Sequence, residues 1–315
     1  PTAVDNGATG IISGAATGTG ASYGVYSYSA SNTINSNAGT IYSSSASGTA
    51  YGVFSVQAAA NIVVTSNTGD IHGVTGGGVT GAGIYAVASS IAIGTNTGTI
   101  TGASATGSAR GVLASTFVTI SDNSGTIKGQ TSSLNAAASV YGAAASNSDV
   151  TVTSNSGLIT AVSTNAGGSG PAYGLYAIRT GVSVGANTGT ISATVAGSGA
   201  AYGVLAYGST ATISNNSGAI YGSSASGGAY GVFSSQAAAN IIVTSNAGDI
   251  YGSSGGSGRG AGISAAASSA SVGNNTGNIY GISATGSAYG VRSNTAVATV
   301  TSNSGTISGS TGGAG

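Results

Sequence analysis

The chain has 315 residues, with five Lys and Arg, five Asp and Glu and one His, so its formal net charge is zero. Charged residues make up 3% of the sequence, against about 25% in an ordinary soluble domain, which excludes a basic surface for nucleic acid. Cys is absent, which excludes disulfides and thiolate metal sites, and no apolar run approaches the ~20 residues of a transmembrane helix.

Glycine is abundant, with 58 residues, and in a polar chain this would suggest disorder. However, 40% of the residues are hydrophobic, the mean hydropathy is +0.29, and Val and Ile recur at fixed positions. We therefore expect a folded protein. Met is absent, so we expect residue 1 to follow a processing site or to lie within a longer chain.

The first element in chain order is an incomplete copy of a repeat. Residues 8–12, "ATGII", keep the Gly and Ile of the later copies but not their Asn, and we expect residues 1–30 to form a degenerate first coil. From "NAGTI" at 37–41 onward, Asn recurs every 27 to 32 residues, with Gly two and Ile four residues later. The Asn positions are Asn37, Asn67, Asn96, Asn123, Asn155, Asn187, Asn216, Asn246, Asn275 and Asn303. The Ile positions are Ile41, Ile71, Ile100, Ile127, Ile159, Ile191, Ile220, Ile250, Ile279 and Ile307.

Each repeat contains three short segments with strand character. One precedes the Asn, as in "VTVTSN" at 150–155, where apolar and polar residues alternate with period two. The second contains the Ile, and the third carries "YGV" or a variant, as at 51–53. A unit of about 30 residues cannot bury a core alone and must stack on its neighbours. The sequence predicts an all-β, single-stranded parallel β-solenoid of about ten coils, three strands per coil, continuous over residues 1–315 and about 50 Å long.

The Asn, the Gly and the Ile of the motif each have an expected structural role. We expect Asn to adopt a left-handed conformation at a corner and to hydrogen-bond the Asn residues of adjacent coils in a ladder. We expect the Gly to supply a turn conformation closed to residues with a Cβ atom, and the Ile to stack inward. Burial of one such Ile contributes about 1.5–3 kcal/mol.

A longer period is superimposed on the short one. Residues 44–71 return almost unchanged as residues 223–250, a shift of 179 residues or six coils. The chain therefore divides into a six-coil block at 37–215 and a partial second block at 216–315.

Two repeats carry longer connecting arcs, at 130–139 and 164–171, which we expect to bulge from one corner. Such loops often carry binding residues. Tyr141 and Tyr173 follow the arcs and occupy the Tyr slot of the "YGV" segment. We interpret this slot as a stacked Tyr ladder, with the alternative of an aromatic stripe for sugar or for contact between rods.

Little catalytic chemistry is encoded. His72 is the only His and aligns with Tyr42 and Tyr251, which indicates a strand position. The five Asp residues are dispersed over different coils, and no zinc, calcium or phosphate motif is present. We expect no catalytic residues, no metal and no cofactor.

The combined pattern "NSGTI…AYGVxA…ATVTSN" resembles the passenger regions of bacterial autotransporter-type surface proteins and related large adhesins. The resemblance covers residues 8 to 309 and implies a right-handed β-helix at the cell surface that serves adhesion, aggregation or matrix building. We expect no C-terminal membrane barrel within these 315 residues, and their low charge departs from the charged exterior of many such proteins.

Three functions are compatible with these features. The first is a non-catalytic extracellular structural protein, a stalk or fibre segment of a bacterial surface adhesin or filament, which self-associates end to end or laterally. The second is a carbohydrate-binding module that uses the long arcs with Tyr141 and Tyr173 to bind host or matrix glycans. The third, ice binding, needs regular Thr rows, and "TVT" at 151–153 and 299–301 is interrupted elsewhere.

Overall fold

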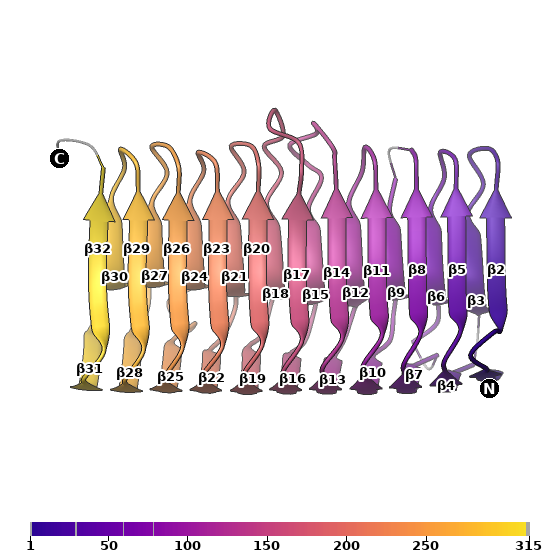
Figure 1. Ribbon diagram of the computed structural model, residues 1–315, viewed down its shortest axis with the longest axis horizontal. Helices are drawn as coiled ribbons and strands as arrows, with labels where there is room; N and C mark the ends of the chain where they lie inside the picture. The colour runs from indigo at the N-terminus through magenta and orange to yellow at the C-terminus, as the bar shows by residue number, and fades with distance from the viewer. Residues whose placement is uncertain (1, 29, 59, 78, 313–315) are drawn as a thin grey trace.

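The computed structural model describes residues 2–28, 30–58, 60–77 and 79–312. The chain winds into a rod of three parallel sheets, and successive strands belong to successive sheets (Figure 1). The described residues contain no helix, which confirms the predicted all-β parallel solenoid. Residues 1 and 313–315, at the two limits of the predicted solenoid, lie outside the described residues.

We name the sheets A, B and C in the order in which the chain enters them. Sheet A consists of β1 (Thr2–Asn6), β4 (Asn32–Asn37), β7 (Ile62–Asn67), β10 (Ile91–Asn96), β13 (Val118–Asn123), β16 (Val150–Asn155), β19 (Val182–Asn187), β22 (Ala211–Asn216), β25 (Ile241–Asn246), β28 (Ala270–Asn275) and β31 (Ala298–Asn303). Sheet B consists of β2 (Ile11–Ala16), β5 (Thr40–Ser45), β8 (Asp70–Thr75), β11 (Thr99–Ser104), β14 (Thr126–Thr131), β17 (Leu158–Ser163), β20 (Thr190–Val195), β23 (Ala219–Ser224), β26 (Asp249–Ser254), β29 (Asn278–Ser283) and β32 (Thr306–Thr311). Sheet C consists of β3 (Ser22–Ser27), β6 (Ala50–Ser55), β9 (Gly81–Ala86), β12 (Ala109–Ala114), β15 (Val140–Ala145), β18 (Ala172–Ala177), β21 (Ala201–Ala206), β24 (Ala229–Ser234), β27 (Gly260–Ala265) and β30 (Ala288–Ser293).

Every strand pairs in parallel with the equivalent strand of the coil before and after it. Asn37 faces Asn67 in sheet A, and Ile71 faces Ile100 in sheet B, so the repeat positions of the sequence become rows along the rod. Sheets A and B each contain eleven strands, and eleven coils at about 4.8 Å span about 50 Å. The rod thus has one coil more than the ten Asn motifs predict.

The additional coil is the first one, and its Asn is present. Asn6 faces Asn37 in the paired strands β1 and β4. The sequence pattern missed Asn6 because the register shifts between Val4 and Asp5, and because Ile12, which faces Ile41, follows Asn6 by six residues. The two additional residues fall in the corner between β1 and β2, where such insertions are tolerated.

The main core is a continuous apolar column between the three sheets, and a smaller separate cluster around Val140 and Val195 lies between sheets B and C. Sheet A contributes residues such as Ile62 and Val64, sheet B contributes the Ile of the motif, and sheet C contributes the residue after the "YG" pair, such as Val53. These side chains are fully buried. Alternate residues of sheets A and B point outward, which gives the period-two pattern of burial in strands such as β5 and β8.

The corner between sheets A and B is the tightest. Only two residues, such as Ala38 and Gly39, separate the Asn from the next strand. The expected left-handed conformations are wrong, because no residue in the described part of the chain has a positive φ. Gly is required by proximity instead: a Cβ atom on Gly69 would lie 2.0 Å from the carbonyl oxygen of Gly39 in the preceding coil.

The other two corners carry the variation. Between sheets B and C, the loops 132–139 and 164–171 have eight residues where the other coils have four or five, and both rise above their neighbours (Figure 1). Asn165 Nδ2 of the second loop donates a hydrogen bond to the carbonyl oxygen of Ser132 in the first. The predicted bulge is therefore present, and the two arcs lie against each other.

Candidate functional site

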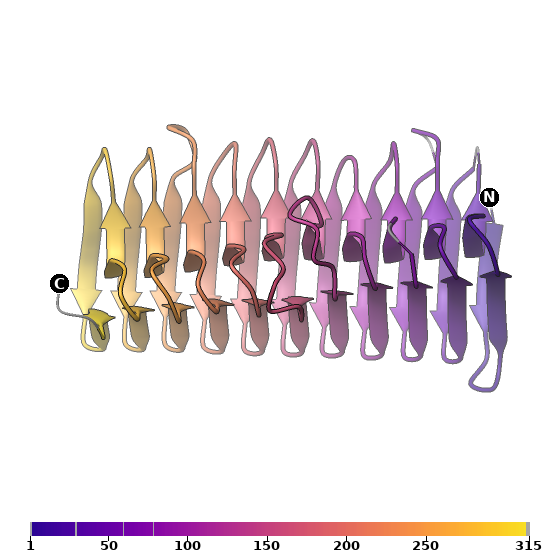
Figure 2. The same cartoon turned by 90° about the horizontal axis from the view of Figure 1, so that it is seen from above.

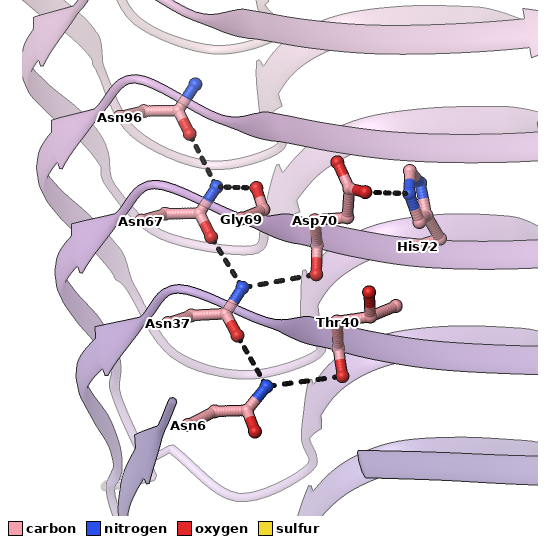
Figure 3. A network of polar contacts seen from close by, with 8 residues as sticks. All are labelled: Asn6, Asn37, Thr40, Asn67, Gly69, Asp70, His72 and Asn96. Carbon is pink, nitrogen blue, oxygen red and sulfur yellow. Dashed lines mark hydrogen bonds and ion pairs between the residues drawn. The ribbon is translucent and has the colours of Figure 1, made fainter. Parts of the chain in front are cut away.

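The Asn residues form the predicted ladder along the corner between sheets A and B. Each Nδ2 donates a hydrogen bond to Oδ1 of the Asn in the next coil, at 2.8 Å for Asn6 and Asn37 and at 2.7 Å in the later coils (Figure 3). The same Nδ2 reaches a backbone carbonyl at the corner, as in the bond from Asn67 to Gly69. The amide of every internal Asn is thereby satisfied although the side chain is buried.

The Asn backbone binds the next coil as well. The carbonyl oxygen of Asn37 accepts hydrogen bonds from the N–H groups of Thr68 and Gly69, at 2.8 and 2.9 Å. The pattern recurs from Asn37 to Asn275, for example at Asn155 with Thr188 and Gly189. The Asn row therefore links successive coils through hydrogen bonds of both its side-chain and its backbone groups.

The Ile row of sheet B explains the second glycine motif. The Cγ2 methyl of Ile41 would lie 2.8 Å from a Cβ atom on Gly24, and Ile100 stands in the same relation to Gly83. Ile41 through Ile279 are fully buried, and Ile307 in the last coil is partly buried. The two motifs of the sequence thus meet inside the rod, where the Gly of sheet C leaves room for the Ile of sheet B.

Tyr141 and Tyr173 lie side by side on the outer face of sheet C. Their ring centroids are 5.3 Å apart with nearly parallel planes, and Tyr176 stacks on Tyr173 at 4.5 Å. The stack continues through Tyr202 to Tyr230. Burial raises the pKa of Tyr173, with a further contribution from Tyr141 and Tyr176. The structure therefore brings both predicted residues together in a ladder, in which Tyr173 lies between Tyr141 and Tyr202 and Tyr141 is the first ring.

Other aromatic stacks have the same construction. On sheet B, Tyr221, Tyr251 and Tyr280 stack at 4.7 and 4.9 Å, and burial raises the pKa of Tyr251 to about 12. On sheet C, the first aromatic cluster runs through Tyr51 and reaches Tyr85, although Ala82 occupies the Tyr slot of that strand. In the next coil the Arg110 guanidinium lies over the ring of Tyr85 at 5.2 Å. These contacts stiffen the outer faces of the sheets.

His72 occupies the strand position expected from the sequence. It faces Tyr42 in β5 and Thr101 in β11, and its Nε2 lies 3.7 Å from Oδ2 of Asp70 (Figure 3). Both side chains are partly exposed on the outer face of sheet B. No group of three or more His, Cys, Asp or Glu side chains gathers within the described ranges.

The repeated hydrogen bonds between coils and the continuous apolar column inside the three sheets define a parallel β-solenoid repeat protein. Comparison of this chain with protein-family models, with curated proteins and with solved structures finds no match in any of the three. None of the described elements is a helix long and apolar enough to cross a membrane.

Proposed function

We propose that this protein is a non-catalytic extracellular structural protein, a stalk or fibre-forming segment of a bacterial surface adhesin or filament. The observation that carries the proposal is the unbroken ladder of hydrogen bonds between coils from Asn6 to Asn303, through which each coil stacks on the one before it. Stacked coils of one repeated cross-section form a long, stiff rod, and length and stiffness are the properties that a stalk or fibre needs.

Surface chemistry supports association of such rods. The chain is neutral and only 3% charged, so the repulsion between two copies is weak. The resemblance of the Asn–Gly–Ile and "YGV" motifs to the repeats of bacterial surface passengers supports an extracellular location. End-to-end stacking would place the first coil of one copy against Val300 and Ile307 of another, continuing the core column.

Electron microscopy of the purified chain at high concentration tests the fibre. We expect filaments with an axial repeat of about 50 Å, the length of eleven coils. Val300→Asp should abolish them, because Val300 continues the buried core row of Val272, whereas the control Thr301→Asp places the same charge at the next residue of β31. Single rods of the wild-type chain at every concentration would refute end-to-end assembly.

Carbohydrate binding by the two long arcs with Tyr141 and Tyr173 is the second candidate. Leu134 at the tip of the first arc is 66% exposed, which favours contact with a ligand. The position of Tyr173 between the rings of Tyr141 and Tyr202 weighs against it, because sugar binding uses a free ring face. Glycan-array binding that disappears when residues 134–137 are deleted would establish this function in place of a purely structural one.

A further inference from the structure

A groove of about 460 Å³ lies at the corner between sheets C and A, across three successive coils. Arg179 follows β18, Tyr207 and Gly208 follow β21, and Gln236 and Ala237 follow β24. The groove is shallow and open to solvent, so a ligand would lie along the surface of the rod. Neither the Asn ladder nor the Tyr141–Tyr173 stack contributes to this groove.

Loop length creates the groove. The loop 235–240 has six residues, whereas the loops 178–181 and 207–210 of the two preceding coils have four. The longer loop closes on itself through the bond from Ala239 N–H to the carbonyl of Gln236, and it projects beyond its neighbours (orange, Figure 2). Ser235 Oγ donates a hydrogen bond to the carbonyl oxygen of Tyr207, which holds the loop 235–240 against the loop 207–210.

Gly208 allows the loop after β21 to lie close to the loop after β18. A Cβ atom at this position would lie 2.3 Å from the carbonyl oxygen of Arg179, so the two backbones are in close contact. Tyr207, beside this contact, is 42% exposed. An exposed aromatic ring next to bare backbone is a surface on which a sugar ring can lie.

Arg179 supplies the charge of the groove. Its side chain is exposed, and no carboxylate of the described residues lies within 4.0 Å of it. Asp149 lies near the same corner, but its Oδ1 accepts a hydrogen bond from Gly181 N–H at 2.9 Å. A guanidinium without an ion-pair partner binds carboxylates through paired hydrogen bonds. Because Arg179 is the only cationic residue that lines the groove, a singly charged group fits better than a phosphate dianion.

We propose that this groove binds an acidic saccharide of the uronate class. Arg179 takes the carboxylate, the Tyr207 ring packs against the apolar face of the sugar, and the Gln236 amide bonds its hydroxyl groups. The site adds a ligand to a protein whose proposed role is structural, and it does not depend on that role.

The six-coil repeat provides an internal comparison. Tyr28 and Gln57 precede Tyr207 and Gln236 by the same 179 residues, and Gln57 also closes its loop, accepting a hydrogen bond from Ala60 N–H. Tyr28 is 59% exposed. The position 179 residues before Arg179 would precede residue 1, so in the 315 residues tested Tyr28 and Gln57 lack both the Arg and the coil that would carry it.

Titration of the 315-residue chain with trigalacturonate, followed by calorimetry and by NMR of 13C-labelled Tyr rings, tests the proposal. We expect saturable binding that shifts the Tyr207 resonance more than that of Tyr28, with at least tenfold weaker binding of uncharged maltotriose. Arg179→Gln should weaken trigalacturonate binding at least tenfold. Lys128→Gln removes one positive charge from sheet B and should change the affinity less than twofold.

Three results would overturn the proposal. They are no binding of trigalacturonate, equal weakening by Arg179→Gln and Lys128→Gln, or a shift at Tyr28 as large as that at Tyr207. Tyr207→Ala provides a second test of the site, since it should weaken the binding of both trigalacturonate and maltotriose. The unfolding temperature of each variant, measured beforehand, identifies any variant that fails to fold. Filament formation is scored on the same samples, so loss of binding and loss of assembly are distinguishable.

Discussion

The Cγ2 methyl of Ile71 in sheet B lies 2.8 Å from the position that a Cβ atom on Gly52 in sheet C would occupy. The carbonyl oxygen of Gly83, in the next coil, lies 2.6 Å from the same position. Gly52 is therefore enclosed by a core side chain and by backbone. This contact explains why Ile and Gly recur together in successive coils.

Gly52→Ala is expected to destabilise the protein by about 1–3 kcal/mol, because the added methyl overpacks the core and meets a carbonyl that cannot move away. Gly20→Ala is the matched control. The nearest heavy atom to a Cβ there is 3.8 Å away, so we expect a change within about 0.5 kcal/mol. Equilibrium denaturant unfolding measures both, and equal losses would contradict the packing account.

A double-mutant cycle isolates the contact itself. Ile71→Ala alone should cost about 2–5 kcal/mol. In the Gly52→Ala/Ile71→Ala double variant, the new methyl occupies part of the space that Ile71 leaves. The combined loss should then be smaller than the sum of the two single losses by more than about 0.5 kcal/mol. Strict additivity would show that Gly52 is constrained by the Gly83 carbonyl alone.

Asn155→Ala, in the middle of the ladder, is expected to cost about 2–4 kcal/mol. It removes the acceptor of Asn123 Nδ2 and the donor to Asn187 Oδ1, and it leaves both partners buried. Asn303→Ala removes only one ladder bond, at an exposed position, and should cost about 1 kcal/mol or less. Similar losses measured by thermal unfolding for the two variants would mean that the ladder bonds contribute little.

Stability should fall as the pH rises from about 10 to about 12. Burial, with smaller contributions from Tyr230 and Tyr176, raises the pKa of Tyr202 from 10.0 to about 12. In this window the unfolded chain loses the phenolic proton and the folded chain keeps it, so unfolding becomes easier; below pH 10 both states are protonated and the effect vanishes. Tyr202→Phe keeps the ring stack and should lose stability less steeply. Unfolding temperatures across this range, with near-neutral values as the control, measure the difference, and identical slopes would contradict it.

Shortening the first long arc tests whether it belongs to the scaffold. Deletion of residues 134–137 leaves four residues between β14 and β15, as between β5 and β6. We expect a change within about 1 kcal/mol, because loop closure depends weakly on length. Deletion of 150–153 from β16, whose Val150 and Val152 are buried, should prevent folding. A loss above about 3 kcal/mol for the arc deletion would make the arcs part of the core structure.

Most of the scaffold was predictable from periodicity. In "VTVTSN" at 150–155, alternation alone places Val150 and Val152 in the core, and both are fully buried. Asn6 escaped detection because β1 is one residue shorter than its partners and its corner is two residues longer, so both diagnostic spacings failed. A comparison that allowed gaps at the corners would have aligned Asn6 with Asn37.

Three sheets, the residues of each strand that point into the core, and the rows of Asn and Ile all follow from the amino-acid sequence. These properties depend on side-chain burial within a segment of a few residues, which local patterning encodes. Tertiary structure alone decided why Gly69 and Gly52 must be glycine, because the atoms that exclude a Cβ belong to other coils. It also decided where Arg179, Tyr207 and Gln236 meet. Residues almost one coil apart in sequence become neighbours only when the coils stack, and the local sequence around each carries no trace of that contact.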